Sequence, residues 1–111
     1  VALAMLLALI PMQIHAEFLS GNDLVQYMRE VDKANASHPQ TGYYEVGNYM
    51  GFVTGVFDAY MAERLICPDP GVTKGQALEI VSVYLKSNPT KWNLNAVVLV
   101  RNAFVSAFPC R

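Results

Sequence analysis

The chain has 111 residues, the length of one domain with a single hydrophobic core. Apolar residues make up 53% of the sequence and charged residues 15%, a composition that excludes an intrinsically disordered chain. The net charge is -1 and the lysines and arginines are scattered, so we expect no nucleic-acid partner.

The first sixteen residues have the pattern of a secretory signal peptide. Val1 to Ile10 is an unbroken apolar run, too short to span a bilayer, and Pro11 to Ala16 forms a more polar exit. We expect cleavage after Ala16, a mature domain of residues 17–111 and no stable membrane insertion. Because a basic start and an initiator methionine are missing, we expect a signal peptide truncated at its N-terminus. A buried N-terminal helix or a lipid-contacting anchor are the alternatives.

Cys67 and Cys110 are the two cysteines of the sequence, and each lies next to a proline. Two cysteines in an exported chain usually pair, so we expect a disulfide that stabilises the fold by roughly 4 kcal/mol on the chain-entropy model. Two buried free thiols are the alternative. No spacing typical of zinc ligands is present, and we expect neither a metal nor a cofactor.

The first predicted helix covers residues 22–36, with Ser20 or Asn22 as its cap. Its apolar positions recur every three or four residues, at Leu24, Val25, Met28 and Val31. Residues 35–42 are rich in Asn, Ser, Pro and Gly, and we expect an exposed loop there.

The second predicted helix covers residues 44–64. We expect a broad apolar face made of Val46, Tyr49, Met50, Val53, Phe57, Tyr60 and Met61. Gly47, Gly51 and Gly55 recur every four residues, and each costs a helix about 1 kcal/mol relative to alanine. Such a stripe favours the close approach of a neighbouring helix within the protomer. A subunit interface is the alternative.

Thr73 and Gln76 form a predicted capping box that starts a third helix over residues 73–87, and Asn88-Pro89 ends it. A fourth helix follows, capped by Asn93 or Asn95. This helix is apolar enough to be the central one, with Leu94, Val97, Val98, Val100, Phe104 and Phe108. Residues 97–100 could also form a strand. We therefore predict an all-α fold, a small helical bundle of about four helices stapled by one disulfide.

The sequence offers no convincing catalytic set, and we expect no enzyme. His38 is the only imidazole of the predicted mature chain and lies in the most loop-like segment. No motif supports a Ser-Lys dyad, and residues 71–76 lack the order of a phosphate-binding loop. Asp58, set among apolar neighbours, could be a buried acid-base group. We favour a carboxylate held by Arg64, Arg101, a tyrosine hydroxyl or a helix terminus.

Three aromatic residues near predicted turns could anchor a protein partner. Tyr43 and Tyr44 border the first loop, and Trp92 ends the connection between the third and fourth helices. They could equally form the edges of the core.

Five short motifs occur in the order found in one known family. These are Leu19–Leu24, Gly51–Asp58, Cys67-Pro68 with Gly71–Gln76, Val83–Leu85 with Asn88-Pro89, and Ala107–Cys110. With them the chain resembles the Rap/Tai immunity family over nearly the whole of residues 17–111.

The resemblance implies a periplasmic helical immunity protein that protects a bacterium from a type VI secretion effector. That effector is a peptidoglycan amidase, a cysteine peptidase, and the immunity protein inhibits it by occluding its active site. The resemblance also implies that the chain can form a homodimer. By the same resemblance a protruding loop enters the cleft, for which our first choice is Ser87, Asn88, Pro89, Thr90, Lys91, Trp92 and Asn93. The loop of residues 37–44 is our second choice.

The chain departs from its relatives at two positions. Met28 and Tyr49 take the places of a further cysteine pair, which leaves one disulfide and weakens the expectation that the first two helices pack rigidly. A small periplasmic acid-stress chaperone, also helical with one disulfide, is the alternative function. The chain has nine acidic residues and a single histidine after residue 16, which disfavours a sharp acid switch.

Overall fold

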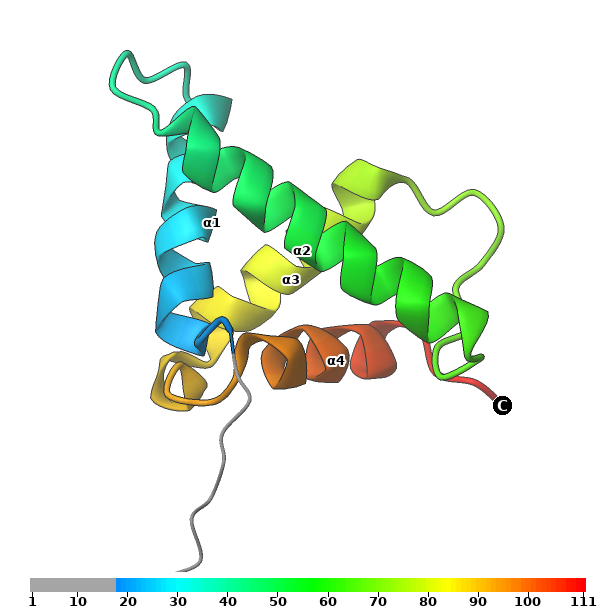
Figure 1. Ribbon diagram of the computed structural model, residues 1–111. Coiled ribbons are helices and arrows are strands. Elements are labelled where there is room, and N and C mark those ends of the chain that lie inside the picture. Colours follow the sequence, from blue (N-terminus) through cyan, green and yellow to red (C-terminus); the bar gives the residue numbers. More distant parts are fainter. Residues whose placement is uncertain (1–17) are drawn as a thin grey trace, which may run out of the picture.

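The computed structural model describes residues 18–111 and consists of helices joined by loops (Figure 1). Within this range the elements are α1 (Gly21–Asn35), α2 (Tyr43–Ala62), α3 (Lys74–Ser87), the 3-10 turn η1 (Pro89–Lys91) and α4 (Ala96–Ala107). The predicted all-α fold of about four helices is therefore confirmed, and the strand alternative for residues 97–100 is wrong. The predicted signal peptide lies outside the described residues.

Two helices begin with the reciprocal hydrogen bonds of a capping box. At the start of α3 the Thr73 hydroxyl accepts from the Gln76 N–H at 3.1 Å, and Gln76 Oε1 accepts from the Thr73 N–H at 2.8 Å, as the sequence predicts. At the start of α1 the same exchange links Ser20 and Asp23. Ser20 rather than Asn22 is thus the cap. Each box satisfies two backbone donors that a helix start leaves free.

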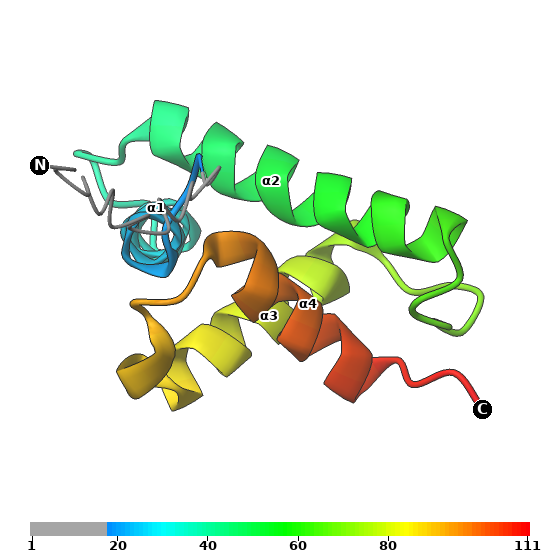
Figure 2. The same cartoon turned by 60° about the horizontal axis from the view of Figure 1, so that its bottom comes forward.

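The helices are arranged so that α2 lies along one edge of the molecule (Figures 1 and 2). α1 packs against α2, α3 packs against α4, and α2 also contacts α3 and α4 from one side. No helix within residues 18–111 combines the length and apolarity needed to cross a bilayer.

The core has its centre on α4, which supplies more buried side chains than any other helix. They are Ala96, Leu99, Val100, Ala103 and Phe104. This agrees with the predicted central helix, but its buried face is rotated from the predicted one, because Leu94 is 37% and Val97 is 41% exposed. α2 buries only Tyr49 and Val53 fully, and Met61, predicted to be apolar core, is exposed.

The predicted disulfide is present. It joins Cys67, in the α2–α3 loop, to Cys110, near the C-terminus, with Cα atoms 4.9 Å apart. The neighbouring backbone supports it, because the Cys67 N–H donates a hydrogen bond to the Phe108 carbonyl at 3.0 Å. The bond therefore ties the segment after α2 to the segment after α4.

Tyr49 and Met28, which the resemblance places where relatives carry a further cysteine pair, are both buried in the core. The Tyr49 hydroxyl donates to the Leu78 carbonyl at 3.0 Å and lies 2.7 Å from the Ser82 hydroxyl. Burial raises the pKa of Tyr49 well above its usual range, so the hydroxyl keeps its proton. α2 is thus joined to α3 by a buried polar contact that needs no disulfide.

We expect Tyr49→Phe to lower the free energy of unfolding by about 2 kcal/mol, because it leaves the buried Ser82 hydroxyl without its tyrosine partner. Urea unfolding measures the change. The double variant Tyr49→Phe/Ser82→Ala serves as the control, since removing both polar groups restores part of the lost stability. Equal losses in the single and the double variant would contradict the role of this contact.

Candidate functional site

The predicted partner-binding segment, residues 87–93, forms the α3–α4 loop at one end of the molecule (Figure 1). Asn88 ends α3 by donating from its side-chain amide to the Tyr84 carbonyl at 2.8 Å. Pro89 then begins the 3-10 turn η1, where its missing N–H and fixed φ suit the first position. The loop is therefore a short, defined turn.

Trp92 fastens the inner side of this loop to the bundle. Its indole N–H donates to the Leu85 carbonyl at 2.8 Å, and its ring packs against the buried core. The Arg29 guanidinium of α1 lies over the ring, 5.6 Å from the ring centroid, at cation-π distance. Of the two interpretations of Trp92, core edge and exposed anchor, the structure favours the core edge.

The start of α1 closes over the end of the loop. The Gly21 N–H donates to the Leu94 carbonyl at 2.7 Å, and the Ala96 N–H donates to the Leu19 carbonyl at 3.0 Å. Gly21 is buried, and a Cβ atom there would lie 2.8 Å from the Leu94 oxygen and 2.5 Å from Leu99 Cδ1. A glycine is needed at this close approach, so α1 and the loop are held as one unit.

We expect Gly21→Ala to lower the free energy of unfolding by about 2 kcal/mol, because the added methyl overpacks this contact. Gly75→Ala is the matched control, because its Cβ would meet nothing closer than Thr73 Oγ1 at 3.9 Å. Chemical denaturation measures both variants. Equal stability of the two would show that the start of α1 shifts without cost.

The outer side of the α3–α4 loop faces solvent. Of the seven predicted partner-binding residues, Asn88 and Trp92 are partly buried and hold the loop, and the other five are exposed: Ser87, Pro89, Thr90, Lys91 and Asn93. The loop thus combines a fixed base with a free outer surface. Whether it contacts a partner stays a prediction.

The second-choice loop, residues 37–44, lies at the opposite end of α1 (Figure 1). The Gly42 N–H donates to Glu30 Oε2 at 2.8 Å, and Glu30 accepts from Lys33 Nζ at 2.7 Å. The Lys33 hydrogen bond, with that of Gly42, lowers the pKa of Glu30. Tyr43 and Tyr44 are 73% and 77% exposed, so they are available as anchors. Because α1 separates the two loops, each is a distinct candidate surface.

The prediction that Gly47, Gly51 and Gly55 let another helix of the protomer approach closely is wrong. A Cβ atom at any of the three would meet no atom of residues 18–111 within 4 Å, and all three residues are exposed. The stripe therefore lies on an exposed face of α2, the helix along one side of the molecule in Figure 2. Of the two original interpretations, only the subunit interface stays open.

Asp58 is exposed, so its interpretation as a buried acid-base group is wrong, and neither Arg64 nor Arg101 forms the salt bridge with it that the favoured interpretation allowed. It lies in a cleft of about 390 Å³ between α2 and the start of α3, beside Thr54, Thr73 and Lys74, and forms no salt bridge with any residue of the range 18–111.

His38 is exposed in the α1–α2 loop, where its Nδ1 accepts from the Gln40 N–H at 3.1 Å. Within the described chain no three potential metal ligands come together.

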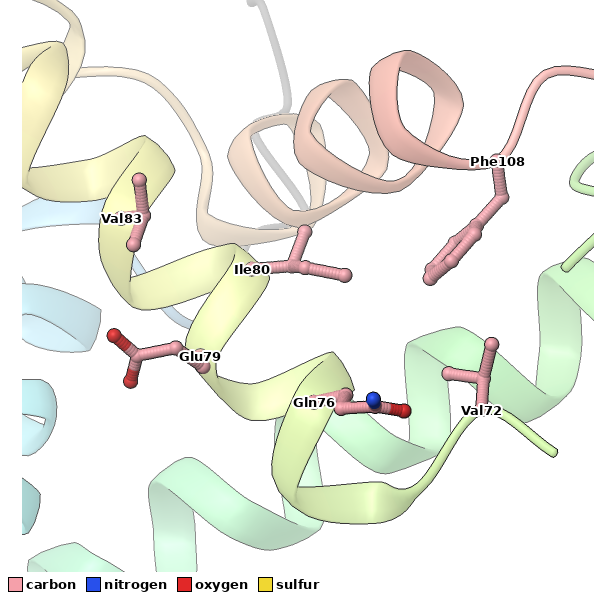
Figure 3. Close-up of a pocket in the computed structure, with 6 residues that line it drawn as sticks. All are labelled: Val72, Gln76, Glu79, Ile80, Val83 and Phe108. Carbon is pink, nitrogen blue, oxygen red and sulfur yellow. The ribbon is translucent and has the colours of Figure 1, made fainter.

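A groove of about 500 Å³ runs between α3 and the C-terminal segment (Figure 3). Ile80 and Phe108 face each other across it, Val72 and Gln76 lie at one end, and Glu79 points away from it. The sequence pattern did not predict this feature. Val83 of α3, which also lines the groove, is 52% exposed.

Comparison with known proteins gives one family. A family model described as Rap1a immunity proteins matches residues 20–110, which span the described fold from the cap of α1 to Cys110. No curated protein and no solved structure matches the chain.

Proposed function

Because the chain belongs to the Rap1a immunity protein family, we propose that it binds and inhibits a type VI secretion effector that is a peptidoglycan amidase. The proposed effector is a cysteine peptidase, and the immunity protein covers its active site. The α3–α4 loop, residues 87–93, enters the cleft. We place this encounter in the periplasm, which is where the predicted signal peptide would direct the chain.

The observation that supports this proposal most directly is that the α3–α4 loop has a fixed base and an exposed tip. Its base is held by the Trp92 indole hydrogen bond, by Arg29 and by the two backbone hydrogen bonds to the start of α1. Its tip, Pro89 to Lys91, is exposed and contains a proline that restricts the backbone. A loop that is ordered before binding loses little conformational entropy when it enters a cleft, and this favours tight binding.

The proposed inhibition is steric. An active-site cleft filled by an ordered loop cannot admit a stem peptide, and the immunity protein needs no catalytic group for this. Lys91 and Arg29, both exposed, place positive charge at this end of the molecule. We expect an acidic or neutral surface around the effector cleft, because like charges in contact would oppose binding.

Inhibition of a purified amidase tests the proposal. The enzyme to use is any peptidoglycan amidase that is found encoded beside the gene for this chain, and release of cleaved peptidoglycan peptides is the measured quantity. We expect one equivalent of the protein to abolish hydrolysis, with a nanomolar or lower Kd. An amidase that stays fully active in excess protein would refute the proposal. Apolar dye binding that rises on acidification would then indicate the chaperone instead.

We further propose that the outward face of α2 joins two copies of the chain. The glycine stripe allows two backbones to approach closely, and the exposed Tyr44 lies next to it in a shallow cleft lined also by Gly47, Gly51 and Phe52. Within residues 18–111 no neighbour lies within 4 Å of a Cβ built on the stripe, and this supports an intermolecular rather than an intramolecular use.

We expect Gly51→Leu to convert the dimer to a monomer without destabilising the protomer. The leucine has open space in the protomer and favours the helix by up to about 1 kcal/mol, but it would keep two α2 helices apart. Sedimentation equilibrium measures the association. Ser106→Leu, at an exposed position of α4, is the control. A wild-type chain that is monomeric at high micromolar concentration would contradict this interface.

A further inference from the structure

The disulfide joins two segments that are anchored to the core very differently. Cys67 directly follows Ile66, whose side chain is 2% exposed. Cys110 belongs to the C-terminal segment, residues 108–111, in which Phe108 is partly buried and the other three residues are exposed. Without the disulfide, the Cys67 side would keep an anchor in the core, whereas within the described chain residues 108–111 have Phe108 as their one partly buried side chain.

Phe108 is held by few contacts. Its N–H donates to the Phe104 carbonyl at 2.8 Å, and its carbonyl accepts from the Cys67 N–H at 3.0 Å. Its ring lies edge-on to Phe57, with centroids 6.0 Å apart, and tilted to Phe104 at 6.1 Å. Its other side forms a wall of the groove opposite Ile80 (Figure 3). The position of this one ring therefore sets both the cover over Phe57 and the shape of the groove.

Cys67 and Cys110 are both exposed, so a thiolate in solution can reach the bond. We propose that the Cys67–Cys110 disulfide is a redox latch for the C-terminal segment. In the oxidised chain the disulfide holds Phe108 over Phe57 and Phe104, so that the Phe108 ring stays in place as one wall of the groove. In the reduced chain the C-terminal segment detaches and the groove opens, while the four helices stay folded. This inference is independent of the proposed inhibition of an amidase.

The reductant is a dithiol, either a small molecule or a protein with two neighbouring cysteines. One of its thiolates attacks a sulfur of the bridge, forms a mixed disulfide and releases the other protein cysteine as a thiolate. The second thiol of the reductant then loses its proton and displaces the remaining protein sulfur. Two electrons pass to the protein, both cysteines end as thiols, and the reductant ends as a disulfide.

Backbone NMR relaxation of the full domain, before and after dithiothreitol, tests the latch. We expect the order parameters of the Phe108 and Cys110 amides to fall from about 0.85 to below about 0.6, the values typical of rigid and flexible backbone. The amide shifts of Met28 and Val53, in the core of α1 and α2, should stay in place. Trp92, whose indole N–H is bonded to Leu85 at the α3–α4 loop, should keep its indole N–H shift.

Two variants separate the effect of the covalent bond from that of Phe108 packing. Cys67→Ser/Cys110→Ser should reproduce the reduced state without reagent. Phe108→Ala with the bond intact should keep the Cys110 order parameter above about 0.6, because the covalent link remains. The proposal is overturned if the segment stays rigid after reduction, which would mean that packing alone holds it. It is equally overturned if the Met28 and Val53 shifts collapse to random-coil values, which would make the bond a staple of the whole fold.

Discussion

Thr90→Arg should weaken binding to the effector at least 100-fold, or about 2.8 kcal/mol. Thr90 is exposed at the tip of the α3–α4 loop, between Pro89 and Lys91. A long side chain there should clash with the walls of a cleft that fits the tip. Since the tip makes no core contact, we expect the melting temperature of the free protein to stay within about 2 °C. Titration calorimetry against the amidase measures the loss.

Two matched variants make this result specific. Ser106→Arg adds the same side chain at an exposed position of α4, remote from the loop, and should leave the Kd within about threefold. Gln40→Arg changes the exposed α1–α2 loop, the second-choice surface. If Gln40→Arg abolishes binding and Thr90→Arg does not, the α1–α2 loop is the inhibitory element. If neither variant has an effect, both loop assignments are wrong.

Replacing both cysteines by serine should lower the free energy of unfolding by about 4 kcal/mol and the melting temperature by about 20 °C. The bond spans 43 positions of sequence, so its removal frees a large loop in the unfolded chain. The native helices lose no core side chain, because both cysteines are exposed. Urea unfolding followed by Trp92 fluorescence measures the change.

The reduced wild-type chain is the natural control for this double variant. If both states lack only the covalent link, their unfolding free energies should agree within about 0.5 kcal/mol. A loss of less than about 1 kcal/mol would contradict this prediction.

Local signals were sufficient for the elements of the fold. The helices, the capping box at Thr73 and Gln76, and the disulfide follow from spacing, from cap chemistry and from the cysteine count, because each depends on residues near in sequence or on a simple pairing. The candidate loop was also found locally, since Asn88-Pro89 must interrupt a helix. The resemblance to the immunity family selected this loop among several.

The sequence did not predict which face of α2 is buried. Spacing places Gly47, Gly51 and Gly55 on one face of α2, but it does not determine whether that face turns inward, and here it turns outward. Asp58 has apolar neighbours in sequence, yet the turn of the helix brings it to the surface. In both cases the outcome depends on which side of α2 the other three helices occupy.

By itself, the sequence predicted four helices close to their observed bounds and the one covalent bond that joins the segments after two of them, although it left a strand at residues 97–100 open. Only the tertiary structure decided which faces are buried, that Arg29 stacks on Trp92, and that Gly21 admits the loop backbone. The physical reason is that the two outcomes depend on interactions over different sequence separations. Helix formation is governed by hydrogen bonds and side chains within about four residues, whereas burial is the summed result of contacts between residues far apart along the chain.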